Sequence, residues 1–173
     1  MLRSILTGAF VAALLTPAAA HVTLENKETK VNAPYRAVLR VPHGCDKSAT
    51  TAIRVKIPEG VIGVKPKPAP GWTLKTVTAK YPKPVKYYHS ELTEGVVVIV
   101  WSGGKLPDDW YEEFIFSGYI SDGLEPGKML YFPVVQECEK GVSRWIEIPA
   151  MGQSEPRHPA PGLKLLPAAL RQH

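Results

Sequence analysis

The stretch Val-Val-Val-Ile-Val-Trp at residues 96–101 decides the fold class of this chain. Its residues are apolar and nearly all β-branched, which is typical of a β-strand. A continuous apolar run without alternating polar residues predicts a central strand that is buried on both faces. The Ser-Gly-Gly that follows at 102–104 ends the run, because glycine favours turns over strand interiors.

Outward from this run, short apolar or alternating segments recur between prolines and glycines. They are predicted as strands at 35–41, 51–57, 61–64, 72–81, 111–119, 129–135 and 143–148. Pro133 marks its segment as an edge strand or a bulge. No window has a helical period with caps. Many short strands separated by turn residues predict an all-β protein, a β-sandwich with immunoglobulin-like topology as the first choice.

The first twenty residues have the pattern of a secretory signal. Arg3 is followed by an apolar segment at 5–15, Pro17 and an Ala-Ala-Ala run at 18–20. Cleavage is predicted before His21, which would become the first residue of the exported chain. A buried N-terminal helix is the alternative. The apolar segment is shorter than the roughly 20 residues that span a bilayer, and no later stretch is longer, so a periplasmic protein without a transmembrane anchor is expected.

Removal of residues 1–20 leaves a chain of one-domain length. A β-sandwich domain is expected at 21–150 and a Pro-rich tail, extended or disordered, at 151–173, in which 163–166 is the candidate for a short strand returning to the sheet.

The signal holds one Arg and no acid, so its removal lowers the net charge from +5 to +4. Lysines at 65–86 are scattered among prolines, which indicates a solvated rim and no nucleic-acid partner.

Cys45 and Cys138 are the two cysteines of the chain. In an oxidising compartment a single pair of cysteines is usually a disulfide. The alternative is a pair of thiolates that bind a soft metal such as Cu(I). Export makes oxidation the expected state, and a disulfide is therefore predicted.

An N-terminal His21 would present an α-amine and an imidazole on the same residue. Both nitrogens can bind one metal ion in a single chelate ring, and Cu(II) prefers nitrogen and oxygen ligands. The amine has an ordinary pKa of about 8, so a strong Lewis acid can displace its proton at neutral pH. Glu25 and Glu28 follow closely, and the spacing leaves either carboxylate open as a further ligand.

No second histidine stands at metal-ligand spacing from His21. His43 lies in a predicted turn and is a reserve candidate, His89 follows a Tyr-Tyr pair, and His158 and His173 lie in the predicted tail. The sequence also contains no defensible Ser-His-Asp arrangement, phosphate-binding Gly loop or HExxH zinc pattern. These absences argue against an enzyme of those classes.

Seven motifs give the chain a resemblance to a known family. They are His-Val-Thr-Leu-Glu at 21–25, Arg-Val-Pro-His-Gly-Cys at 40–45, Ile-Pro-Glu-Gly-Val at 57–61, Pro-Gly-Trp at 70–72, Trp-Ser-Gly-Gly at 101–104, Gln-Glu-Cys at 136–138 and Arg-Trp-Ile-Glu at 144–147. In this order they resemble the YcnI-like copper-binding family of exported proteins. The resemblance implies an immunoglobulin- or cupredoxin-like sandwich that binds Cu(II) through a monohistidine brace.

Carried over to this chain, the resemblance implies that His21 supplies the amine and imidazole, that Glu28 is the carboxylate ligand, and that Trp145 lies close to the metal. The family thus favours Glu28 over Glu25, which spacing left open. Asn26 stands where proline is expected, and the C-terminal membrane helix of some relatives is lacking. For Trp145 the alternative is an ordinary core residue, although its indole could also shield one side of the ion.

The expected function is therefore periplasmic Cu(II) binding in copper trafficking or homeostasis, as a metallochaperone or buffer and not as an enzyme. Its partners would be the copper ion and another periplasmic copper chaperone or a copper transporter. Two alternatives remain from other classes. One is a copper-dependent polysaccharide oxygenase, which also begins with histidine, and the other is a metal-free extracellular interaction module.

Overall fold

The computed structural model describes residues 21–150, 152, 154 and 156–169, and in these ranges it contains twelve strands and no helix. The first sheet has the order β1 (Thr23–Leu24), β3 (Ala33–Val41), β8 (Glu112–Ile120), β5 (Val61–Pro66). The second has the order β11 (Val142–Trp145), β10 (Val134–Cys138), β4 (Thr50–Lys56), β7 (Ser90–Leu106), β6 (Thr73–Tyr87). A third consists of β2 (Glu28–Lys30), β12 (Gly162–Leu166) and β9 (Met129–Tyr131).

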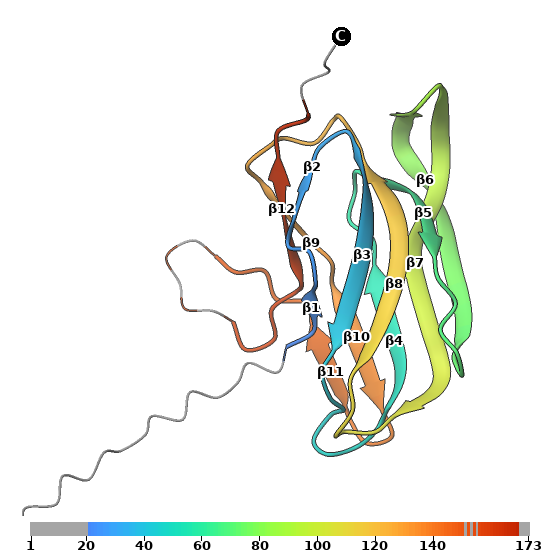
Figure 1. Cartoon of the computed structure of the whole chain (residues 1–173), viewed down its shortest axis with the longest axis vertical. Helices are drawn as coiled ribbons and strands as arrows, with labels where there is room; N and C mark the ends of the chain where they lie inside the picture. Colours follow the sequence, from blue (N-terminus) through green and yellow to red (C-terminus); the bar gives the residue numbers. More distant parts are fainter. Residues whose placement is uncertain (1–20, 151, 153, 155, 170–173) are drawn as a thin grey trace, which may run out of the picture.

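The two larger sheets pack face to face, and the three-stranded sheet lies along one side of them (Figure 1). Aromatic side chains fill the space between the sheets. Trp101 of β7 packs against Phe114 of β8 with ring centroids 5.3 Å apart, and Phe116 lies 5.8 Å from Phe132. All four are fully buried. The predicted all-β sandwich is therefore confirmed.

The run at 96–101 lies in β7, between β4 and β6, but it is not buried on both faces throughout. Ile99, Val100 and Trp101 are buried, whereas Val96 and Val97 are partly exposed. The prediction was wrong for this first half. The physical reason is tertiary packing, because Val96 and Val97 line an open pocket of about 400 Å³ between β7 and the turn at 58–61.

Near its C-terminal end the chain returns to the fold as β12. This strand runs parallel to β2 and antiparallel to β9, and its Leu163 and Leu165 are buried in the hydrophobic core. The short strand considered for this segment is thus present, and packed structure continues to Leu166, well beyond residue 150. Alternation explains the strand, because the leucines at 163 and 165 face inward while Lys164 remains exposed.

The predicted disulfide between Cys45 and Cys138 is confirmed, with Cα atoms 5.9 Å apart and a sequence separation of 93 residues. It ties the end of β10 to the loop that precedes β4. Both sulfurs are used in this bond, so the alternative of two metal-binding thiolates is wrong. The single strand predicted at 129–135 was wrong, because Pro133 lies between β9 and β10, at the point where the chain passes from the three-stranded to the five-stranded sheet. Proline has no N–H to donate to a sheet, which explains the break.

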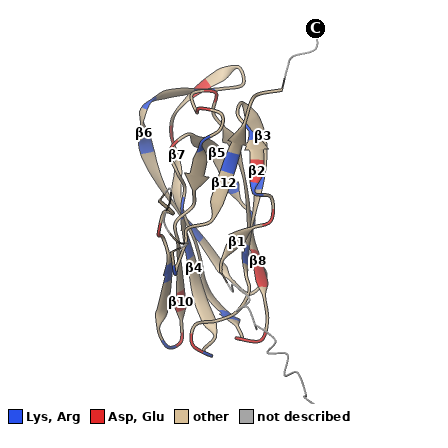
Figure 2. Cartoon of the chain, turned by 90° about the vertical axis from the view of Figure 1, so that its left-hand side faces the viewer, with Lys and Arg blue, Asp and Glu red and all other residues tan. Residues whose placement is uncertain are grey.

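Charged residues of both signs are interspersed along the strands (Figure 2). Within the part of the chain that the structure describes, no helix is long and apolar enough to cross a membrane. The predicted signal at residues 1–20 lies outside the described residues.

Candidate metal site

His21 lies two residues before the first residue of β1, which is an edge strand of the four-stranded sheet. Thr23 pairs with Arg40 and Leu24 with Leu39 of β3, so the segment that follows His21 is fixed by ladder hydrogen bonds. Val22 and Leu24 are buried, whereas His21 is only half-buried. Burial of its neighbours therefore anchors the segment and leaves the imidazole at the surface.

Trp145, at the end of β11, lies against His21. The ring centroids are 5.5 Å apart, with an angle of 54° between the ring planes. Trp145 is 5% exposed and belongs to the hydrophobic core. Trp145 is thus a core residue, and its indole also contacts His21. It was expected either in the core or close to the metal, and these two positions are compatible.

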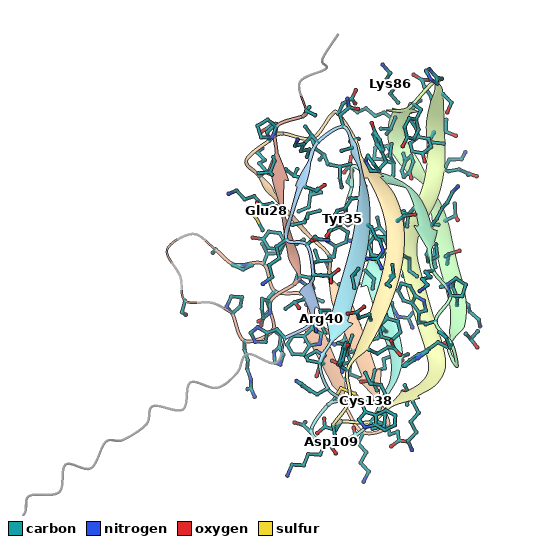
Figure 3. The ribbon with its side chains drawn as sticks, in the orientation of Figure 1. Glu28, Tyr35, Arg40, Lys86, Asp109 and Cys138 are labelled. Carbon is teal, nitrogen blue, oxygen red and sulfur yellow. A yellow bond between two sulfur atoms is a disulfide. The ribbon has the colours of Figure 1, made fainter. Side chains whose placement is uncertain are left out.

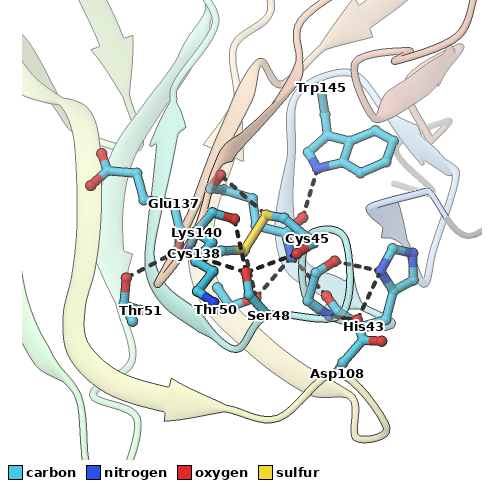
Figure 4. Close-up of a disulfide and its surroundings, with 12 residues drawn as sticks. His43, Cys45, Ser48, Thr50, Thr51, Asp108, Glu137, Cys138, Lys140 and Trp145 are labelled. Atoms are coloured by element: carbon cyan, nitrogen blue, oxygen red, sulfur yellow. Dashed lines mark hydrogen bonds and ion pairs between the residues drawn. A yellow bond between two sulfur atoms is a disulfide. The ribbon is translucent and has the colours of Figure 1, made fainter.

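Gln136 forms a hydrogen bond with the indole of Trp145, and the sequence analysis did not identify it. The Trp145 Nε1–H donates to Gln136 Oε1 at 2.9 Å, and Gln136 Nε2 donates to the Thr50 hydroxyl at 2.8 Å and to the His43 carbonyl at 2.7 Å. Figure 4 shows three of the residues that Gln136 bonds, Trp145, Thr50 and His43, in the surroundings of the disulfide. Gln136 is 1% exposed. A buried amide with such partners fixes the orientation of Trp145.

His43, the reserve candidate, belongs to the disulfide loop. Its Nδ1 lies 3.9 Å from Asp108 Oδ1, and the same oxygen accepts a 3.0 Å hydrogen bond from the Gly44 N–H. The ring therefore lies beside Asp108, and the backbone carbonyl of His43 is connected, through Gln136, to Trp145.

A second histidine, His158, lies against Trp145, with ring centroids 5.3 Å apart in an edge-on arrangement. Its segment is tied to the residues after β11: the His158 N–H donates to Glu147 Oε2 at 2.7 Å, and the Glu147 N–H donates to the His158 carbonyl at 3.1 Å. Two imidazoles thus contact one indole. Spacing could not reveal this, because His158 lies in the segment predicted as a tail and its contact with Trp145 is tertiary.

The two candidate carboxylates are exposed and pair with different cations. Glu25 Oε2 lies 3.9 Å from Arg36 NH1, and Glu28 Oε1 lies 3.6 Å from Lys164 Nζ of the neighbouring strand. Figure 3 shows Glu28 on the three-stranded sheet and Arg40 on β3. Exposed pairs of this kind contribute about 1 kcal/mol or less. A metal ion can therefore replace the cation at little cost.

The turn before Glu28 is held by Tyr35, another residue that the sequence did not suggest. The buried Tyr35 hydroxyl donates to the Asn26 carbonyl at 2.7 Å. Burial raises the pKa of Tyr35 well above its ordinary value, so the hydroxyl stays protonated and able to donate at neutral pH. This bond fixes the turn without the expected proline at position 26.

Replacement of this tyrosine, Tyr35→Phe, is expected to lower the free energy of unfolding by about 1 kcal/mol at pH 7, because the Asn26 carbonyl loses its donor. Above a pH of about 10, the unfolded wild-type chain loses the phenolic proton while the folded chain keeps it. Wild-type stability therefore falls there, and it should fall less in the variant. Urea unfolding at pH 7 and pH 10.5 measures both effects. Tyr111→Phe, at an exposed ring, is the control, and equal behaviour of the two variants would contradict the assigned role.

A pocket of about 250 Å³ opens beside His21. It is lined by His21, Val22, Thr23, Leu24, Lys27, Met129, Tyr131, Pro149, Pro159, Ala160, Pro161 and Gly162. Among the described residues, no three His, Cys, Asp or Glu side chains are grouped so that they could hold a metal ion. A metal at this pocket must therefore draw on the amine that cleavage before His21 would create, or on a donor of another type.

The comparisons with known proteins place the chain in a family. The model of the family described as a domain of unknown function (DUF1775) matches residues 21–165. No curated protein sequence matches the chain. Among solved structures, it is similar to an uncharacterized protein from Nocardia farcinica with an immunoglobulin-like fold, at 28% identity and a TM-score of 0.64, over 85% of this chain and 99% of that one. The chain thus belongs to the DUF1775 family, which is the domain family of YcnI-like proteins.

Proposed function

We propose that the protein is an exported, periplasmic Cu(II)-binding protein that acts in copper trafficking or homeostasis as a metallochaperone or buffer. The observation that carries the proposal is the position of His21. It follows directly on a predicted cleavage site, begins the region matched by the family, and lies half-buried at an open pocket against Trp145. A histidine so placed would offer two nitrogens to one ion.

The donor set suits Cu(II). The α-amine and imidazole of His21 would supply two nitrogens, and a carboxylate would supply an oxygen and a negative charge. Glu28 is the preferred carboxylate, as the resemblance to the YcnI-like family implies. The chain neighbours of both candidates, Leu24 for Glu25 and Lys27 for Glu28, line the pocket of His21. The Trp145 indole, fixed by Gln136, would cover one side of the site and keep water from it.

A copper site with so few protein donors suits a protein that passes copper to a partner better than one that stores it in a fully coordinated, buried site. An ion bound at the surface by one residue and one carboxylate remains accessible to ligands from a second protein. The proposed recipients are another periplasmic copper chaperone or a copper transporter. No catalytic role is assigned to the chain.

A copper-dependent polysaccharide oxygenase is the second candidate, and an aromatic surface near β1 favours it. Trp110 and Tyr111 are 66% and 60% exposed. The Arg40 guanidinium lies 5.4 Å from the centre of the Tyr111 ring, and Arg40 pairs with Thr23, two residues from His21. Peroxide-driven oxidation of a polysaccharide by the copper-loaded protein, at a rate well above that of free copper, would favour this candidate over the chaperone.

Glu28→Ala is expected to lower the Cu(II) affinity about tenfold, whereas Glu25→Ala should change it little. Both changes remove one exposed carboxylate from the segment that follows His21, so each serves as the control for the other. Competition with a Cu(II) chelator measures the affinities, and electron paramagnetic resonance shows whether one oxygen ligand is replaced. The reverse order of affinities would assign the ligand to Glu25.

A further inference from the structure

Met129 is an apolar residue that the fold leaves at the surface, beside the proposed copper site. It is 43% exposed and lines the same pocket as His21. Its methyl end lies over Gly162, where a Cβ atom would stand 2.8 Å from Met129 Cε. Glycine at 162 therefore makes room for the thioether arm. The thioether is a soft donor that neither the brace nor the core requires.

The three-stranded sheet places this thioether on the same face as the proposed carboxylate ligand. Lys164 of β12 pairs with Glu28 on one side and with Met129 on the other. Directly paired residues project from the same face of a sheet. Leu163 and Leu165 point into the core, so this row of three residues faces outward. A hard oxygen donor and a soft sulfur donor thus flank one lysine.

The walls of the pocket favour an ion of low charge. Val22, Leu24, Ala160 and several prolines line it, and Lys27 is the charged residue among the lining residues. Apolar surroundings and a nearby cation both disfavour a dication more than a monocation. Thioether sulfur binds Cu(I), whereas carboxylate oxygen does not prefer it. The apolar lining of the pocket and the thioether donor of Met129 therefore both favour Cu(I).

We propose that this pocket also binds Cu(I), through the His21 imidazole and the Met129 thioether, while Glu28 serves Cu(II). The inference rests on the proposed copper function of His21 and names a second form of the cargo. Each ion is taken up in the oxidation state in which it is supplied, and no electron transfer is involved. In the Cu(I) form Glu28 keeps its partner Lys164, so no carboxylate is left unpaired.

Met129→Leu tests the proposal, because leucine retains the size of the side chain and removes only the sulfur. Under anaerobic conditions, competition with a chromogenic Cu(I) chelator should show that the Cu(I) affinity of the mature protein falls about tenfold or more. The Cu(II) affinity should stay unchanged. X-ray absorption of the Cu(I)-loaded wild type should show copper–sulfur scattering that Met129→Leu lacks.

Met151→Leu is the matched control, since it removes a thioether that lies outside the described residues. Glu28→Gln is the complementary variant, and it should weaken Cu(II) binding but not Cu(I) binding. Circular dichroism and the thermal midpoint confirm that each variant is folded. Unchanged Cu(I) affinity in Met129→Leu, absence of sulfur scattering in the wild type, or loss of Cu(I) binding in Met151→Leu would each overturn the proposal.

The same measurements distinguish failure of the proposed copper function from failure of the Cu(I) inference alone. If His21 is not a copper ligand, His21→Ala leaves both affinities unchanged, and neither Met129→Leu nor Glu28→Gln has an effect on either ion. If only the inference fails, the Cu(II) affinity still depends on His21 and Glu28, while the Cu(I) affinity is independent of Met129.

Discussion

A mature protein with one glycine added before His21 is expected to bind Cu(II) about 100-fold more weakly or worse. The extension turns the α-amine into an amide, whose nitrogen no longer offers a free lone pair, and moves the new amine away from the imidazole. The chelate ring at His21 is then lost, although every side chain of the site is retained. Competition with a Cu(II) chelator measures the change in affinity.

The matched control for this experiment is one glycine added after His173, which alters the length of the chain equally and leaves the amine free. Mass spectrometry must first show that the processed wild type begins with His21. Electron paramagnetic resonance of the extended protein should show fewer nitrogen ligands than in the wild type. Unchanged affinity in the extended protein would rule out the brace and return His21 to an incidental role.

The strands could be predicted well from the sequence because their signals are local. Alternation at 51–57 and β-branching at 96–101 follow from which faces of a strand are buried. The half-exposure of Val96 and Val97 could not be predicted in the same way. It depends on the pocket left between β7 and the turn at 58–61, which is a property of tertiary packing.

The candidate site was only partly predictable, because some of its residues are brought together by tertiary contacts. His21 could be recognised because processing would give it special chemistry. Gln136 left a weak signal, because it is a polar residue two positions after the buried Val134 of the same strand, and this signal could have been used. His158 and Tyr35 left none, since their roles depend on contacts with Trp145 and Asn26 that join distant parts of the chain.

The disulfide and the candidate site are connected through β10. Cys138 ends this strand, Gln136 lies two residues before it, and the Gln136 amide positions Trp145. Thr50 contacts both groups, since its hydroxyl accepts from Gln136 Nε2 and lies 3.7 Å from Cys138 Sγ. The same strand thus links the covalent cross-link to the indole beside His21.

The double variant Cys45→Ala/Cys138→Ala is therefore expected to lose about 4–5 kcal/mol of unfolding free energy, the value of the chain-entropy model for a closed loop of this length. The unfolded chain gains conformational freedom, whereas the folded chain loses one bond between elements that hydrogen bonds still hold. Urea unfolding of both proteins under oxidising conditions measures the difference, and wild type with a reducing agent should resemble the variant.

Measuring the Cu(II) affinity of the double cysteine variant shows whether loss of the disulfide affects the metal site as well as the stability of the fold. At low urea the variant should remain folded, because β10 keeps its pairing with β4 and β11, and Gln136 should still accept the bond from Trp145. Its Cu(II) affinity should then be close to that of the wild type while its stability is much lower. A loss of stability below about 1 kcal/mol would mean that the unfolded chain is already restricted at these positions. A large loss of affinity in the folded variant would instead make the disulfide part of the metal site, because its effect would then reach His21 through Gln136 and Trp145.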